Sequence, residues 1–153
     1  MIIIANRWGL AKVFCLIAAL WPVAARTEDA ACAKSEFEAV VEEAAGGLRE
    51  LNTKNKPAFQ DKLRQLKTKR GWSQDQFLTE AAPYVRDDAT VEYDQMTDEL
   101  LLAISTMGQE GANAKKPDCA LLLELRARMK VLVDTQTKKW MHMFEKIDGE
   151  LWK

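Results

Sequence analysis

The C-terminal part of the sequence imposes the strongest constraint on the fold, because its apolar residues recur at the spacing of one long α-helix. Between residues 119 and 151 a large apolar side chain returns every three or four positions, which places these side chains on one helix face. The stripe comprises Leu122, Leu125, Met129, Leu132, Val133, Trp140, Met143, Phe144, Ile147 and Leu151. Only Gln136 breaks it. A helix of about thirty residues is about 45 Å long, so either it bends, or its end protrudes, or a partner covers it.

The same periodicity upstream predicts further helices, and we find no strand-like alternation. Helices are expected over residues 35–51, 56–70, 74–82, 88–107 and 117–148. Pro83 and Gly108 are the expected stops of the third and fourth helices, with a polar loop over residues 109–116. Amphipathic helices with short connections favour an all-α fold, an antiparallel bundle of about four helices plus one short helix.

The clearest local signals surround the predicted turn at residue 71. Gly71 stands where a helix ends on a left-handed residue. Ser73 followed three positions later by Gln76 is a capping box, and Trp72 with Phe77 has the spacing of a hydrophobic staple. These signals predict that a short helix begins directly after the turn.

Residues 1–25 have the features of a secretory signal peptide. Arg7 and Lys12 give a positive start, residues 13–20 are apolar, and small residues precede the expected cleavage site after Ala25. The uncharged stretch is shorter than the roughly 20 residues that span a bilayer, which disfavours a permanent anchor. We therefore expect one helical-bundle domain over residues 26–153, periplasmic or secreted, with no transmembrane span in the mature chain.

Removal of the leader leaves two cysteines, Cys32 and Cys119. An even pair in an oxidising compartment predicts a disulfide, and two buried free thiols are the alternative. Because the closed loop is long, the loss of chain entropy in the unfolded state predicts a stabilisation of about 4.5 kcal/mol.

Charge is nearly balanced over the whole chain but segregated along it. The formal net charge is −1, which excludes nucleic acid as an expected partner. Residues 27–50 and 71–99 are acidic, whereas residues 51–70 are basic. The basic patch comprises Lys54, Lys56, Lys62, Arg64, Lys67, Lys69 and Arg70. Such a patch either binds an anionic surface or an acidic protein face, or is a solvated helix face balanced by its acidic neighbours.

Few residues suggest catalysis or a cofactor. The single histidine, His142, lies between Met141 and Met143, a set of ligand types that suits Cu(I). Successive helical residues point about 100° apart, so we expect an exposed His142, a buried Met143 and no metal or other cofactor. The serines stand outside nucleophile motifs, so no catalytic residue is predicted, and paired carboxylates stay open as a hydrolytic alternative.

Apolar residues that fall off the stripes are the predicted partner contacts. On the C-terminal helix these are Leu123, Val131, Met141 and Trp152. Gathered together they would form an adaptable surface for a partner helix or an unfolded chain. The sequence thus favours a non-enzymatic exported protein that acts through protein–protein contact in the cell envelope, as an adaptor, assembly factor, chaperone-like holder or inhibitor. A carrier of a small ligand or metal, such as copper or haem, is the alternative.

Overall fold

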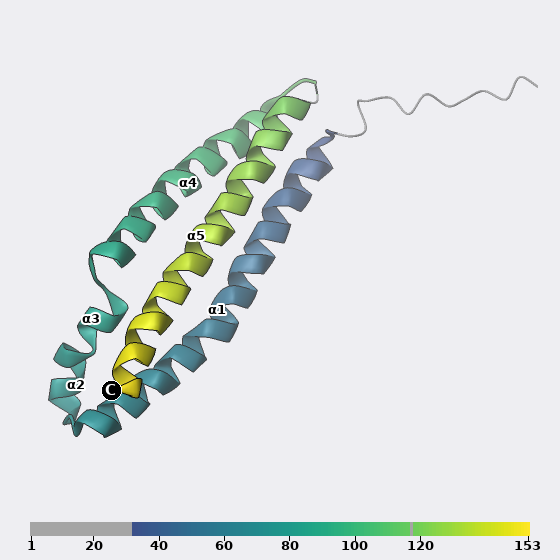
Figure 1. The fold of residues 1–153 in the computed structure, drawn as a ribbon. Helices are drawn as coiled ribbons and strands as arrows, with labels where there is room; N and C mark the ends of the chain where they lie inside the picture. The colour runs from purple at the N-terminus through teal and green to yellow at the C-terminus, as the bar shows by residue number, and fades with distance from the viewer. Residues whose placement is uncertain (1–31, 117) are drawn as a thin grey trace, which may run out of the picture.

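The computed structural model describes residues 32–116 and 118–153, which form helices joined by short connections (Figure 1). The helices are α1 Lys34–Arg70, α2 Gln74–Glu80, α3 Ala82–Val85, α4 Asp88–Asn113 and α5 Cys119–Trp152. No strand occurs within these residues, so the all-α prediction is confirmed. The predicted signal peptide lies outside the described residues. None of the described helices combines the length and apolar character needed to cross a bilayer.

Two predicted helices, 35–51 and 56–70, are in fact the single helix α1. Pro57 lies inside it, although an internal proline removes a hydrogen bond and costs about 3 kcal/mol. Just beyond it, Phe59, Leu63 and Leu66 are buried, and each contributes about 1.5–3 kcal/mol when removed from water. Tertiary burial therefore outweighs the local break, and the prediction of a break was wrong for that reason.

The two helix termini near residue 71 lie where the sequence predicts them, whereas two other helix boundaries differ from the prediction. Gly71 has φ 66°, and the capping box between Ser73 and Gln76 is formed in both directions. Pro83, the expected stop, instead lies in the first turn of α3, where its missing N–H is not needed. Gly108 does not end α4, which runs on to Asn113, so the connection to α5 is shorter than the predicted loop.

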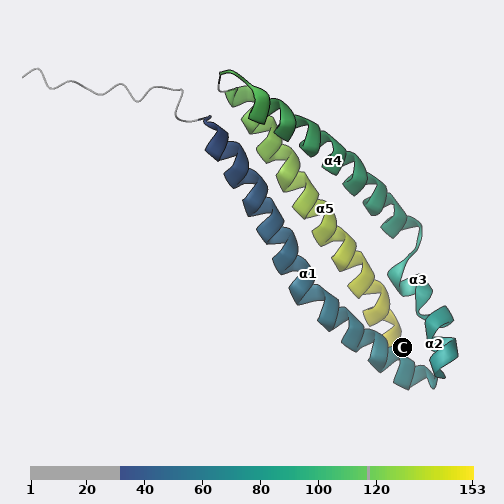
Figure 2. The same ribbon diagram turned by 180° about the vertical axis from the view of Figure 1, so that it is seen from behind.

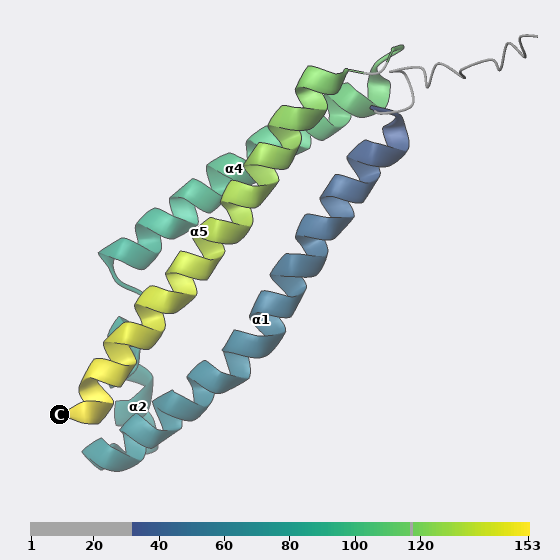
Figure 3. The ribbon, with the colours of Figure 1, turned by 45° about the vertical axis from the view of Figure 1, so that its right-hand side comes forward.

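Three long helices make the body of the molecule, because the merged α1 spans its full length. Helix α5 packs against both α1 and α4, while α1 and α4 meet each other at few positions. Figures 1 and 2 show α5 between the other two from opposite sides, with α2 and α3 near the C-terminal end of α5. Helix α4 runs antiparallel to α1 and α5, which run parallel to each other (Figure 3).

The apolar side chains form two clusters along the rod. The first lies near the start of α5 and contains Cys32, Phe37, Val40, Ala44, Ile104, Met107, Leu122, Leu125, Met129 and Leu132. The second contains Phe59, Leu63, Leu66, Ala81, Met143 and Ile147, and partly buried aromatic residues such as Trp72 and Phe77 pack against it. Gln136, the predicted break in the stripe, falls on α5 between the clusters and donates a hydrogen bond to Thr97 Oγ1 at 2.6 Å.

Candidate functional site

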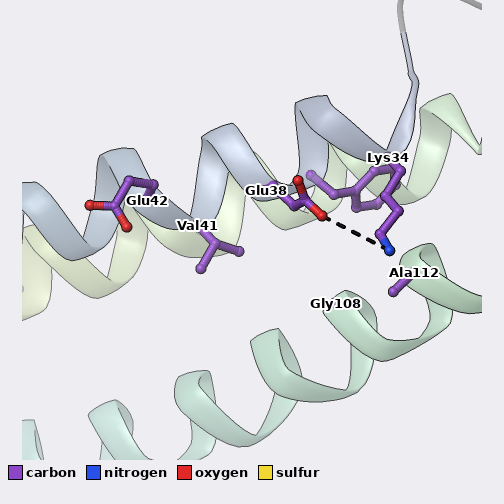
Figure 4. Close-up of a pocket in the computed structure, with 7 residues that line it drawn as sticks. Lys34, Glu38, Val41, Glu42, Gly108 and Ala112 are labelled. Atoms are coloured by element: carbon purple, nitrogen blue, oxygen red, sulfur yellow. Dashed lines mark ion pairs between the residues drawn. The ribbon is translucent and has the colours of Figure 1, made fainter.

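A groove opens between α1 and α4 at the end of the molecule where α1 begins (Figure 4). Its volume is about 270 Å³. Helix α1 supplies Lys34, Phe37, Glu38, Val41 and Glu42, and α4 supplies Gly108 and Ala112. In Figure 4 the labelled side chains of α1 stand above the small residues of α4.

The small residues of α4 determine how this groove is shaped. At Gly111 an added Cβ would lie 2.5 Å from Phe37 Cε1, so the absence of a side chain lets the buried Phe37 ring lie against α4. At Gly108, one turn earlier, no atom lies within 4 Å of the corresponding position. The two helices therefore touch at Phe37 and leave open space beside Val41, which is 40% exposed.

Beyond the residues that line the groove, helical spacing extends the same side of each helix. On α1, residues 34, 38, 41, 45 and 48 follow one another by three or four positions, and on α4 residues 98, 101, 105, 108 and 112 do the same. Leu101 lies two turns before Gly108 on this side and is 47% exposed. From its first to its last residue each stripe advances 14 positions, which at 1.5 Å per residue is about 21 Å. Each stripe is therefore about four helical turns long.

The charged side chains that line the groove are Lys34, Glu38 and Glu42, all from α1, and the acidic residues of α4 lie outside the lining. Glu38 lies 4.0 Å from Lys34, and Glu42 accepts a hydrogen bond from Arg49 at 2.5 Å. Every charged side chain of α4 is acidic: Asp88, Glu92, Asp94, Asp98, Glu99 and Glu110. Of these, Asp94 forms an ion pair, with Lys139 of α5. Among the described residues the other five have no ion-pair partner within 4 Å.

The only histidine takes part in a polar clasp between α4 and α5. Asp87 caps the start of α4, and its Oδ2 atom accepts hydrogen bonds from His142, at 2.8 Å, and from Lys146. The Lys146 hydrogen bond holds the pKa of Asp87 well below its ordinary value; desolvation opposes this, and His142 and Thr90 add to the lowering. The prediction that His142 is exposed is therefore wrong, since only 29% of its side chain is exposed.

The residues around His142 diverge, as helical geometry requires. Met141 is 56% exposed and Met143 is buried in the second cluster. Within residues 32–116 and 118–153, no three His, Cys, Asp or Glu side chains are grouped to hold a metal ion.

The predicted disulfide is confirmed. Cys32 and Cys119 are bonded, with their Cα atoms 5.1 Å apart and 87 positions apart in sequence. Cys32 belongs to the first apolar cluster, which also contains Phe37 from the groove. The bond thus ties the start of α1 to the start of α5 at the groove end of the molecule.

The basic patch is largely engaged in contacts within the molecule. Arg64 pairs with Asp61, Lys62 with Asp148 and Arg70 with Glu150, and Lys67 donates to Gln74. Lys69 donates to the carbonyl oxygens of Glu150, at 3.3 Å, and of Leu151, at 2.7 Å, near the end of α5. Cations at this position suit the negative end of a helix. Lys54 and Lys56 are exposed, and no described acid lies within 4 Å of them.

The predicted partner contacts are exposed but spread along α5. Leu123, Val131, Met141 and Trp152 are 65%, 45%, 56% and 88% exposed. Leu123 and Met141 share a face but lie about 27 Å apart along the helix, and Val131 points about 80° away from them. The structure therefore does not gather these four into one patch.

The groove was missed because its two walls come from separate helices. Val41 fits the buried stripe of its own helix, and Gly108 fits the pattern of a helix end. The available signal was the group of small residues at 108, 111 and 112, which allows close approach of another helix. Comparisons with protein-family models, curated proteins and solved structures found no match to the chain.

Proposed function

We propose that this is an exported, non-enzymatic helical protein that acts through protein–protein contact, and that the α1–α4 groove holds one helix of its partner. The observation that carries the proposal is the groove in which the half-exposed Val41 lies opposite Gly108 and Ala112. Helical spacing places the half-exposed Leu101 on the same side of α4, two turns before Gly108. A helix that lies in a groove contacts it through side chains spaced by three and four residues. The two stripes have that spacing.

The helix pair α1–α4 supports this choice of occupant. Both helices pack well on α5 but meet each other at few positions, so the seam between them lacks the covering that a fourth helix gives in a four-helix bundle. An added helix would bury Val41, Leu101 and the small residues between them.

Two features support export. The Cys32–Cys119 bond is typical of oxidising compartments such as the periplasm or the extracellular space. Residues 1–25 have the positive start, the apolar run and the small residues before the cleavage site that are typical of a signal peptide. Detection of a mature chain that begins at Arg26, by mass spectrometry of the exported protein, tests this part of the proposal.

The contact surface is tested with a matched pair of neighbouring residues. Leu101 and Leu102 are both exposed, at 47% and 72%, but point about 100° apart on α4. The probe is a peptide of about 18 residues with Leu at helical spacing and Gln elsewhere. We expect Leu101→Gln to weaken peptide binding about 10-fold or more, and Leu102→Gln to leave it unchanged. Equal effects of both substitutions, or no binding by the wild type, would contradict the proposal.

A further inference from the structure

We infer that the α1–α4 groove of one molecule holds the outer face of α5 from a second copy of this chain, so that copies associate head to tail. This inference rests on the proposed function and identifies the partner helix. It follows from an exposed apolar stripe on α5 whose position, side-chain sizes and flanking charges match the groove.

The stripe occupies the first half of α5, on the side away from α1 and α4. Its members, all exposed, are Ala120, Leu123, Ala127 and Val131. Ala127 lies two positions from both Leu125 and Met129, which are buried, so it points about 160° away from them. From Ala120 to Val131 the helix advances 11 positions, which is about 17 Å or three turns. The stripe therefore presents apolar side chains on successive turns.

The stripe and the groove lie on opposite sides of the molecule. Helix α5 packs against both α1 and α4, so the groove between those two helices opens away from α5. A copy that places its stripe in the groove of another therefore keeps its own groove free. A contact between two different surfaces of this kind repeats from copy to copy and builds an open chain where it does not close into a ring.

The stripe and the groove also lie at the same level along the rod. Cys32 and Cys119 are bonded at a separation of 87 positions, and α1 runs parallel to α5 (Figure 3). Residues 120–131 of α5 are therefore level with residues 33–44 of α1, and the groove is lined by α1 residues between 34 and 42. Copies that stack side by side in the same direction bring stripe and groove together without an axial shift.

In this stacking, small side chains face large ones. Ala127 is level with residue 40, beside the half-exposed Val41. Leu123 is level with residue 36, next to Phe37, whose contact with Gly111 places Ala112 at the same level. The larger side chain of each surface thus lies against an alanine of the other, which allows two helix surfaces to interdigitate.

The charges beside the stripe match the α1 wall of the groove. Arg126 pairs with Glu36 of its own α1 at 2.9 Å, so this flank of α5 is on the α1 side. In a copy stacked in the same direction, that flank faces the α1 wall of the next copy. Arg126 and Lys130 are then level with residues 39 and 43, one position from Glu38 and Glu42 respectively.

These four charged side chains keep the partners that they have within each copy. Glu38 and Glu42 pair with Lys34 and Arg49, and Lys130 pairs with Asp134. Association therefore brings opposite charges together at the rim and leaves none of them unpaired. Exposed charges at a rim contribute little affinity, and they act mainly on orientation.

The outer face of α4 offers a poorer match. Leu102 is 72% exposed, but Asp98 and Thr106 stand one turn before and after it. Its apolar surface is therefore limited to one turn, and its acidic neighbour would face the carboxylates of the α1 wall. Leu102 for this reason supplies the control position for the test.

The test measures the mass of the purified protein, with its disulfide formed, by sedimentation equilibrium. A contact through one helix of about three turns is small, so we expect a dissociation constant of about 0.1–1 mM. From about 10 µM to about 1 mM the average mass should rise from that of a monomer to beyond that of a dimer.

Matched lysine variants block one surface at a time. Val41→Lys in the groove and Leu123→Lys in the stripe should each keep the protein monomeric at about 1 mM, a loss of affinity of about 10-fold or more. An equimolar mixture of the two variants retains one intact groove and one intact stripe, so it should form a 1:1 dimer and nothing larger. Leu102→Lys should assemble as the wild type does.

Two further measurements separate a blocked surface from a damaged fold. Ala112→Lys changes an exposed residue of the other groove wall and should act as Val41→Lys does. Circular dichroism melting shows whether each variant is folded. In the wild type, an excess of the leucine peptide described under the proposed function should return the protein to a monomer, because the peptide occupies the groove.

The outcomes distinguish this inference from the proposed function. A wild type that binds the peptide but stays monomeric at about 1 mM overturns the inference and leaves the proposed function standing, with a helix of another protein as the occupant. A protein that neither binds the peptide nor assembles removes both. A dimer that Leu123→Lys dissociates, but Val41→Lys and Ala112→Lys do not, would be a symmetric pair of α5 helices and would also overturn the inference, as would a mixture of the two blocked variants that stays monomeric.

Discussion

Phe37 of α1 lies against Gly111 of α4 so closely that a Cβ atom at position 111 would fall 2.5 Å from Phe37 Cε1 and 2.6 Å from Cδ1. Phe37 is 5% exposed and belongs to the first apolar cluster. The ring therefore cannot move aside without disturbing its other contacts. This contact is where α1 and α4 approach each other at the groove end of the molecule.

Gly111→Ala should therefore destabilise the protein, despite the better helix propensity of alanine. Overpacking lowers the free energy of unfolding by about 1–3 kcal/mol, and the better helix propensity of alanine restores up to about 1 kcal/mol. We therefore expect urea unfolding to show a net loss of about 1–2 kcal/mol. Gly108→Ala is the control, because open space surrounds that position; it should raise stability by up to about 1 kcal/mol. A more stable Gly111→Ala protein would contradict the observed contact.

Reduction of the disulfide should cause a large loss of stability. The bond closes a loop of 87 positions, for which chain entropy predicts about 4.5 kcal/mol, with native strain lowering the figure. The double variant Cys32→Ser, Cys119→Ser should show a similar loss in urea unfolding. Maleimide labelling of the denatured native protein should find no thiol at either position before reduction, and full labelling of both would refute the prediction.

Asp87→Asn should remove a stabilisation that depends on pH. Because the folded-state pKa of Asp87 lies below its ordinary value of 3.8, the ionised group stabilises the fold above about pH 4, and this contribution is lost as the pH falls towards the folded-state pKa. Urea unfolding from pH 3 to pH 7 should show wild type more stable at pH 7, with the difference from Asp87→Asn shrinking below pH 4. A constant difference would exclude the carboxylate as its source.

Gln136→Leu should join the two apolar clusters. Gln136 is half-buried and its amide donates to Thr97, whose hydroxyl also donates to the Tyr93 carbonyl oxygen at 2.7 Å. Thr97 therefore keeps one hydrogen-bond partner, and the leucine adds apolar contact between the clusters. The free energy of unfolding should rise by about 1 kcal/mol. Gln136→Ala, which only removes the hydrogen bond and packing, should lower it by a similar amount. A destabilised Gln136→Leu protein would show that the polar contact is required.

Local signals predicted the structure best where a few neighbouring residues determine it. The turn at Gly71 and the capping box of Ser73 with Gln76 depend on side chains within one or two turns, so both could be predicted from the sequence. Pro57 is different, because the burial that keeps α1 continuous comes from contacts with α5 far along the chain. A local pattern does not contain those contacts.

The groove depends still more on tertiary structure. Val41 fits the buried stripe of its own helix, but its exposure depends on the separation of α1 and α4. That separation is set by the contact of Phe37 with Gly111 and by the packing of both helices on α5. The stripes show which residues face inward, whereas only the structure shows which of them another helix leaves uncovered.

The parallel direction of α1 and α5 gives the disulfide a second effect, the alignment of two helices that no hairpin loop connects. The sequence offset between paired residues is 87 at Cys32–Cys119, 88 at Asn52–Trp140 and 86 at Lys62–Asp148. Sliding α5 by one turn, about 5.4 Å, would separate all three pairs together. A single covalent bond at one end therefore selects the register along the whole rod, as a short turn does in an antiparallel pair.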